Sequence, residues 1–267
     1  MKRFLSILLV CILFSGIFAL AGCQKNSDKL IVGMELAYPP FETKDDAGDP
    51  TGISVDLAKA IGEHIGREVE IVDTAWDGLI PSLMTGKIDM IISSMTITEK
   101  RKEEVNFSDP YANAYLAILA NKDSGITGID DLNQPGRKVA VKTGSTGYLY
   151  AQDNLENAEI IALADESACV MEVSQGKADG FLYDQLTIYR NNLNNPDTTT
   201  AIFIPFQNVE HWGIAINKEN TELLAQVNEF LKEFLLDGGF DVLTEKYLKE
   251  EKEAFDRFGF QWFFDLQ

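Results

Sequence analysis

Short runs of apolar and β-branched residues alternate with stretches of helical periodicity from residue 30 onward. This alternation is typical of an α/β fold. In the first half of the chain it predicts a strand at 30–33, a helix at 53–65, a strand at 69–72, a helix at 79–84 and a strand at 88–92. The last run is almost entirely apolar, as expected of a strand buried on both faces of a parallel sheet.

A second, smaller set of elements follows the first. It comprises a strand at 139–141, a helix at 148–155, a strand at 160–162, a helix at 167–175 and a strand at 178–183. Two further apolar segments, 115–120 and 211–217, separate this set from the rest and are predicted to cross between two domains. The expected division is therefore a discontinuous first domain, residues 30–116 with 212–267, and a second domain at 117–211.

The last part of the chain is expected to return to the first domain. A long amphipathic helix has apolar residues from Leu223 to Phe234, and Gly238 and Gly239 would end it. The tail at 254–267 is dense in aromatic residues: Phe255, Phe258, Phe260, Trp262, Phe263 and Phe264. Because such a run rarely stays in water, we expect it to pack on the first domain. A docking surface for a membrane partner is the alternative.

The first residues have the parts of a secretory signal peptide at 1–22. Lys2 and Arg3 precede an apolar core at 4–18, which is too short for a spanning helix of about 20 residues. The following sequence, Leu20-Ala21-Gly22-Cys23, resembles the lipobox of bacterial lipoproteins, in which the cysteine becomes the lipid-bearing first residue. Cys23 would then carry the lipid and residues 23–29 would form a tether. The alternative is an ordinary secreted cysteine.

Charge and cysteine content narrow the possible partners. Removal of residues 1–22 takes away two cations and no acid, which moves the formal net charge from −19 to −21. This charge disfavours binding to nucleic acid or to anionic lipid surfaces. With Cys11 in the signal peptide and Cys23 lipidated, Cys169 is the one cysteine left, so a disulfide framework is excluded and the core must supply the stability.

The segment after the 88–92 strand is the first candidate site. It contains small hydroxyl residues, including Ser94 and Thr96, and then a charged helix with Thr98 as its expected N-cap. Ligands of parallel sheets bind just beyond the carboxyl ends of the strands. Arg101 would present its planar guanidinium there to a carboxylate, with the hydroxyl groups beside it. The alternative is that Arg101 is one cation on a solvated helix.

Five segments, in order along the chain, carry a family resemblance. They are Tyr38-Pro39-Pro40-Phe41-Glu42, Val55-Asp56-Leu57-Ala58, Trp76-Asp77-Gly78-Leu79-Ile80-Pro81, Ile91-Ile92-Ser93-Ser94-Met95-Thr96-Ile97-Thr98 and Phe107-Ser108-Asp109-Pro110-Tyr111. The chain resembles the polar amino-acid-binding lipoproteins of bacterial ABC importers, the extracellular solute-binding proteins of family 3. The resemblance implies the two-domain α/β periplasmic-binding-protein fold of type II, with two hinge strands and closure on the ligand.

The resemblance also implies how the charges of a free amino acid are paired. Arg101 would bind the α-carboxylate, assisted by Thr96 and the backbone near Ser94. Thr146, at the start of a helix of the second domain, would face the same anion. Asp184 would bind the α-ammonium group; read from the residues alone, it is equally a helix N-cap. Tyr38 and Trp76 match the aromatic positions around the ligand side chain, although read alone either ring is expected in the core.

The preferred side chain stays open at this point. Glu35 matches an acid found in binders of cationic amino acids, whereas Lys142 matches a lysine of relatives that prefer glutamine. If the two pair with each other, the pocket is nearly neutral, and glutamine, histidine, arginine and cystine are all candidates. Tyr183 and His211 are further candidates for the same space, with a structural role favoured for His211.

The implied function is binding of a free polar L-amino acid outside the cytoplasmic membrane and its delivery to an ABC permease with its ATPase. We expect a monomer that is attached to the membrane through its lipid alone and that uses neither a cofactor nor a metal. An amino-acid sensor module is one alternative. An enzyme similar to cyclohexadienyl dehydratase is another, although the sequence has no nucleophile motif, no His/Cys metal cluster and only two histidines.

Overall fold

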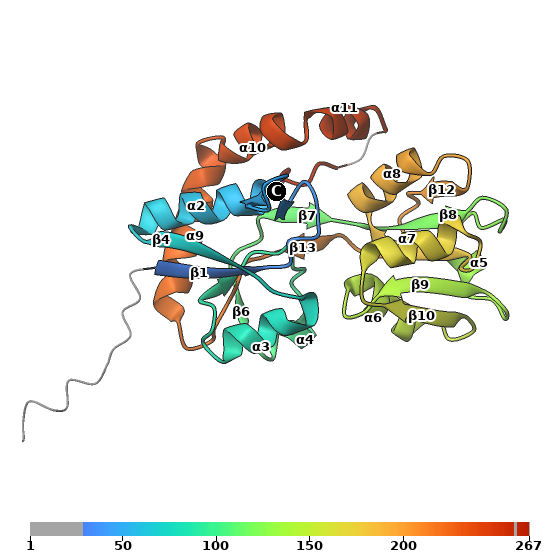
Figure 1. The fold of residues 1–267 in the computed structure, drawn as a ribbon, viewed down its shortest axis with the longest axis horizontal. Coiled ribbons are helices and arrows are strands. Elements are labelled where there is room, and N and C mark those ends of the chain that lie inside the picture. The colour runs from blue at the N-terminus through green and yellow to red at the C-terminus, as the bar shows by residue number, and fades with distance from the viewer. Residues whose placement is uncertain (1–28, 259–260, 267) are drawn as a thin grey trace, which may run out of the picture.

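The computed structural model describes residues 29–258 and 261–266 and divides them between two lobes (Figure 1). Each lobe is built around a five-stranded sheet. Within the described residues, none of the helices combines the length and the apolar character that crossing a bilayer requires. The expected signal peptide and the expected lipidation site at Cys23 lie outside the described residues.

The first sheet combines segments from distant parts of the chain. In spatial order its strands are β4 (Glu68–Asp73), β1 (Lys29–Met34), β5 (Met90–Ile91), β14 (Ala215–Ile216) and β6 (Asn106–Phe107). β1 is parallel to β4 and β5, whereas β14 is antiparallel to β5 and β6. The strand predicted at 88–92 is shorter than expected. The carboxylate of Asp89, rather than a backbone carbonyl, accepts the N–H of Ile31 at 2.9 Å.

The second sheet lies in the other lobe. Its strands, in spatial order, are β10 (Glu159–Leu163), β9 (Lys138–Lys142), β11 (Gly180–Asp184), β8 (Leu116–Asn121) and β12 (Thr199–Ile202). β9, β10 and β11 are parallel, and β8 is antiparallel to β11 and β12. The carboxyl ends of β9 and β11 are at Lys142 and Asp184, where the parallel-sheet rule places a ligand.

Two short antiparallel strands cross between the lobes, β7 (Ala112–Ala114) and β13 (Glu210–Trp212). The prediction that the apolar segments 115–120 and 211–217 form the crossing was therefore wrong in detail. Residues 116–121 are β8, a strand inside the second sheet, which explains the apolar run up to Ala120. The segment 211–217 is split between β13 at the crossing and β14 in the first sheet.

Helices cover the sheets of both lobes (Figure 1). The first lobe carries α2 (Ile53–Ile65), η1 (Trp76–Gly78), α3 (Leu79–Met84), α4 (Glu99–Lys102), α9 (Thr221–Leu236), α10 (Gly239–Tyr247) and α11 (Lys249–Phe258), and also a hairpin of β2 (Thr43–Lys44) and β3 (Pro50–Thr51). The second carries α5 (Ile129–Leu132), α6 (Thr146–Asn154), α7 (Glu166–Ser174) and α8 (Gln185–Asn194). The predicted helices at 53–65 and 79–84 are confirmed at both ends.

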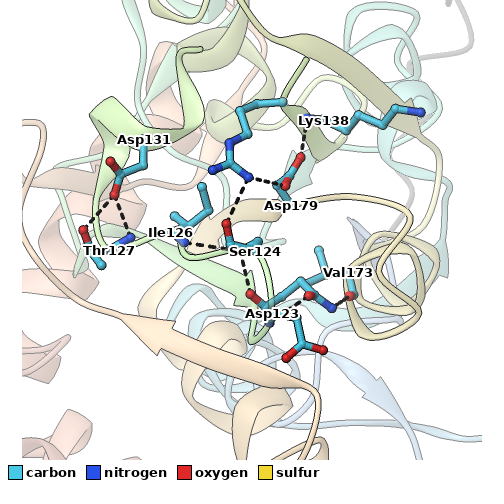
Figure 2. Close-up of polar contacts among 10 residues, drawn as sticks. Asp123, Ser124, Ile126, Thr127, Asp131, Lys138, Val173 and Asp179 are labelled. Atoms are coloured by element: carbon cyan, nitrogen blue, oxygen red, sulfur yellow. Dashed lines mark hydrogen bonds and ion pairs between the residues drawn. The ribbon is translucent and has the colours of Figure 1, made fainter. Parts of the chain in front are cut away.

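A polar network joins the strand ends of the second sheet that lie away from the crossing (Figure 2). The carboxylate of Asp179, just before β11, accepts from Arg137 at 2.7 Å and from the backbone N–H of Lys138 at 2.8 Å. Arg137 also donates to the carbonyl of Ser124 at 3.0 Å, after β8. These bonds hold β8, β9 and β11 together at one end, so the other ends of β9 and β11 are presented from a fixed base.

The aromatic tail packs on the first lobe, as predicted. The rings of Phe255, Trp262, Phe263 and Phe264 are all buried. Phe263 is fully buried, and its ring centroid lies 5.4 Å from that of Phe41 and 5.6 Å from that of Trp212 in β13. The Phe263 carbonyl also accepts from the backbone N–H of Asn113 in β7 at 2.6 Å. The tail therefore contacts both crossing strands; Phe260 lies outside the described residues.

We expect Phe263→Ala to lower the free energy of unfolding by about 3–5 kcal/mol, because it leaves a cavity beside Phe41 and Trp212. Chemical denaturation followed by tryptophan fluorescence and circular dichroism measures this loss. The matched control is Leu236→Ala, because Leu236 is 76% exposed at the end of α9 and its truncation should change the same quantity by no more than about 0.5 kcal/mol. Equal losses in the two variants would contradict the packing role of the tail.

Candidate functional site

A small cavity between the two lobes brings together most of the predicted binding residues. It encloses about 50 Å³, which is room for a few water molecules. The predicted residues that line it are Glu35, Tyr38, Trp76, Ser94, Thr96 and Arg101 from the first lobe, and Thr146 and Asp184 from the second. Lys142 is not part of the lining but contacts one of its members, as described below. Residues far apart in the sequence therefore form a single site.

Arg101 is buried at this cavity and does not lie on a solvated helix face. Thr98 caps α4 as predicted, since its hydroxyl accepts the backbone N–H of Arg101 at 3.2 Å. The guanidinium donates to the Thr96 carbonyl at 2.6 Å and, across the cleft, to the Gly144 carbonyl at 3.1 Å. Burial lowers the pKa of Arg101 to about 10, so the side chain is charged at neutral pH.

Trp76 lies close to two cations that come from different lobes. The centroid of its ring is 5.2 Å from the Arg101 guanidinium carbon and 5.6 Å from the Lys142 ammonium nitrogen. Cations are attracted to the negative face of an indole ring. Trp76 therefore helps to hold both charges at the edge of the cavity.

Asp184 ends β11 and caps α8. One of its carboxylate oxygens, Oδ1, accepts from the backbone N–H groups of Leu186 at 3.0 Å and Thr187 at 3.1 Å. The capping role that the sequence left open is thus present, and the same carboxylate also lines the cavity. Burial raises the pKa of Asp184, while the backbone N–H groups of Thr187 and Leu186 favour the ionised form.

Thr96 and Thr146, one from each lobe, direct their hydroxyl groups at the same carboxylate oxygen. That oxygen is Oε2 of Glu210, at 3.2 Å from Thr96 and 2.8 Å from Thr146. Ser145 caps α6 by accepting from the N–H of Tyr148, so Thr146 is the first helical residue. At the next position, a Cβ on Gly147 would lie 2.3 Å from the Leu182 carbonyl oxygen, so the start of α6 packs directly on β11.

Ser94 and a buried acid, Glu42, form one side of the cavity. Ser94 has a left-handed backbone with φ of 48°, a strained conformation for a residue other than glycine. Its hydroxyl donates to Glu42 at 3.1 Å, and the hydroxyls of Ser54 and Ser93 donate to the same carboxyl group at 2.6 and 3.4 Å. Burial raises the pKa of Glu42 to about 8, in spite of these hydrogen bonds.

Glu35 and Lys142 form an ion pair across the cleft. Glu35 follows β1 in the first lobe, Lys142 ends β9 in the second, and both side chains are largely buried. Near them, burial and the charge of Asp184 raise the pKa of Glu166 to about 7. Of the two further candidates, Tyr183 lines the cavity, whereas His211 lines a neighbouring surface groove.

A family comparison agrees with this geometry. Residues 30–250 match the model of the bacterial extracellular solute-binding proteins, family 3. The chain belongs to this family. Its two sheet-containing lobes and the paired crossing strands are the type II fold that membership implies.

Relatives of this solute-binding protein are named as amino-acid-binding proteins. The L-cystine-binding protein TcyJ of Escherichia coli (strain K12) is 32% identical over 225 residues, 84% of each chain. The ancestral amino acid-binding protein AncCDT-1, a precursor of cyclohexadienyl dehydratase, is 40% identical with a TM-score of 0.75, over 82% of this chain and 95% of its own. The arginine-bound form of truncated ArgBP from T. maritima is 40% identical with a TM-score of 0.71, over 78% and 96%.

Sequence analysis of this family 3 protein missed two acids of the cavity, Glu42 and Glu210. Glu42 lies inside the quoted segment 38–42, but its hydroxyl partners are 12 to 52 residues away along the chain. Glu210 opens a strand of only three residues, too short to show a pattern, and its two hydroxyl partners are 64 and 114 residues away. Among the described residues there is no cluster of His, Cys, Asp and Glu suited to a metal ion.

The raised pKa of Glu42 predicts a pH dependence of the stability of this solute-binding protein. The folded protein retains the Glu42 proton up to about pH 8, whereas an unfolded chain releases it near 4.5. The stabilising contribution is complete below pH 4.5 and is lost as the pH rises through 8. We expect Glu42→Gln to remove this loss, measured by urea unfolding across that range.

The control for this experiment is Glu104→Gln, which changes an exposed acid. Its stability should follow that of the unmodified protein at every pH. If the curve for Glu42→Gln also stays parallel to that of the unmodified protein between pH 4.5 and 8, the buried carboxyl does not titrate as described.

Proposed function

We propose that this protein binds a free polar L-amino acid outside the cytoplasmic membrane and delivers it to an ABC permease. The observation that carries the proposal is the placement of Arg101 and Asp184, opposite charges from opposite lobes, on one cavity. A free amino acid is a zwitterion, and both of its charges need partners where water is excluded. Family membership and the names of the relatives support the same function.

In this proposal each end of the ligand has its own partners. Arg101, Thr96, the Ser94 backbone and Thr146 bind the α-carboxylate, and Asp184 binds the α-ammonium group. The rings of Tyr38 and Trp76 lie beside the ligand side chain. Because these groups come from both lobes, binding and closure are one event. The moving bodies are residues 30–116 with 212–267 and residues 117–211, hinged at β7 and β13.

The Glu35–Lys142 pair bears on which side chain is bound. Because the two residues pair, together they contribute no net charge to the pocket. This supports a pocket that accepts a polar side chain, whether neutral or cationic. Glutamine, histidine, arginine and cystine are therefore all candidates. The named ligands of the relatives, cystine for TcyJ and arginine for ArgBP, fall within this range.

The remaining features of the proposal come from the sequence. Lipidation of Cys23 would hold the protein at the outer face of the cell membrane through acyl chains, with residues 23–29 as a tether. The proposed partners are a permease and its ATPase, with the protein acting as a monomer. An amino-acid sensor module uses the same binding step, and gene neighbours that encode a permease and an ATPase would favour transport.

A dehydratase is the second candidate function. It is favoured by the likeness to AncCDT-1, which is described as both an amino acid-binding protein and a precursor of cyclohexadienyl dehydratase. Incubation of the purified protein with prephenate or arogenate distinguishes the two, because loss of CO2 together with water would produce an aromatic product that absorbs in the ultraviolet.

A thermal-shift screen of the purified protein against the common L-amino acids and cystine tests the proposed function. We expect at least one polar amino acid to raise the melting temperature, since a ligand at a hundredfold excess over Kd adds ~2.7 kcal/mol of stability. Sugars and dicarboxylic acids without an amino group are the controls. A screen in which no amino acid shifts the melting temperature would contradict the proposal.

We expect Arg101→Ala to weaken binding of that amino acid by about 3–5 kcal/mol, because its carboxylate would be buried without a counter-charge. Titration calorimetry measures the change, which corresponds to a Kd at least about a hundredfold higher. Lys100→Ala, on the exposed face of the same helix, is the control and should keep the original Kd. A change of less than about twofold for Arg101→Ala would exclude the carboxylate role.

A further inference from the structure

Glu210 already uses the two hydroxyl groups that the proposed function gives to the ligand carboxylate. Its oxygen Oε2 accepts from Thr96 of the first lobe at 3.2 Å and from Thr146 of the second lobe at 2.8 Å. Its other oxygen accepts from Gln207 at 2.9 Å. The side chain is part of the cavity lining, together with Arg101.

Two carboxylates cannot share this position. A threonine hydroxyl has a single proton to donate, and Glu210 accepts the protons of both Thr96 and Thr146. The cavity has only about 50 Å³ of free space. Two like charges so close together in a poorly hydrated site also repel each other strongly. A ligand carboxylate therefore has to take the hydroxyl donors away from Glu210.

The structure provides a place to which Glu210 can move. Glu210 also lines a broad groove of about 830 Å³, together with Gln207 and Lys102. Rotation of the side chain into this groove leaves the backbone pairing of Glu210 with Ala114 intact. The groove is open to water, and its lining includes Lys102, whose ammonium group pairs with the exposed Glu99 at 2.8 Å.

We propose that Glu210 is an exchangeable internal anion, which the α-carboxylate of the incoming amino acid displaces from the Thr96 and Thr146 hydroxyls. The inference rests on the proposed function and adds a residue that sets affinity and selectivity. Because Glu210 joins the lobes through the same two hydroxyls, the ligand replaces an existing bridge. An amine that lacks the α-carboxylate cannot make this exchange, so Glu210 favours complete amino acids over their decarboxylated analogues.

The test uses Glu210→Ala and the conservative Glu210→Gln, with the amino acid that gives the largest shift in the thermal screen. Removal of the competing anion should lower the Kd about tenfold for Glu210→Ala, since hydrogen bonds to a charged group no longer have to be broken. Glu210→Gln should lower it by less, because the amide keeps hydrogen bonds without the charge. Glu219→Ala, an exposed acid beyond β14, should leave the Kd unchanged.

Two results would overturn the inference. One is a Kd that rises or stays constant in both Glu210 variants, while their melting temperatures without amino acid show that they are folded. The other is a crystal structure of the complex in which Glu210 still accepts both threonine hydroxyls. A supporting structure has the ligand carboxylate at those hydroxyls and Glu210 turned into the groove.

The proposed function can fail separately from this inference. If an amino acid binds and Arg101→Ala abolishes binding, but neither Glu210 variant tightens it, the internal-anion role alone is wrong. If no amino acid binds to the unmodified protein or to Glu210→Ala, the proposed function is wrong and this inference fails with it.

Discussion

The buried guanidinium of Arg101 is the constraint on which the rest of the cleft depends. A buried cation needs opposing charge or well-directed dipoles, and this one donates to the carbonyl oxygens of Thr96 and Gly144. One carbonyl belongs to each lobe, so the charge joins them. The Gly144 carbonyl is available because β9 ends just before it and α6 begins just after it, with α6 packed directly on β11. The tight packing of the second lobe thus positions the Gly144 carbonyl that accepts from Arg101 of the first lobe.

The acids around this cation differ in their protonation state and in what stabilises that state. Glu42 has a pKa raised by burial to about 8 and carries little charge at neutral pH. Asp184 is held as an N-cap by backbone N–H groups, which favour its ionised form. With Glu210 turned into the groove, the fixed charges of the site would be Arg101 and Lys142 against Glu35 and Asp184. These four charges cancel, which matches the opposite charges of an α-carboxylate and an α-ammonium group; Glu166, with a pKa of about 7, is not part of this sum.

Sequence periodicity predicted the regular elements well, because the apolar spacing within each helix or strand reflects which of its own faces is buried. The helix at 53–65 was predicted to the residue, since its apolar spacing and the glycine at position 66 mark both its face and its end. The crossing strands were predicted poorly. β7 and β13 have three residues each, and their pairing with each other depends on a contact that spans about a hundred positions. The apolar run next to β7 was predicted to be the crossing strand, although it forms β8 inside the second sheet.

The candidate site divides in the same way. Arg101 was predicted from its place just beyond a strand end, whereas Thr146 and Asp184 were predicted from the family resemblance; all three line one cavity. Glu42 and Glu210 had no such local mark. Their roles come from hydroxyl partners that only the folded chain brings near. Side chains near strand ends can therefore be predicted from sequence more readily than buried acids such as Glu42 and Glu210, whose hydrogen-bond partners are distant in the sequence.

Some residues of the crossing strands also line the cavity. Because the aromatic tail at the C-terminal end packs against these strands, it is linked to the proposed binding site. Glu210 and Trp212 belong to β13, and the backbone of Thr96 forms a bridge with that of Trp212. The tail fixes this region from behind, because the Phe263 ring contacts Trp212 and its carbonyl accepts the N–H of Asn113 in β7. The crossing strands are thereby attached to the first lobe by side-chain packing as well as by their own pairing. In the proposed closure, the tail therefore holds the hinge strands on the side of the first lobe, and the second lobe turns about β7 and β13 relative to it.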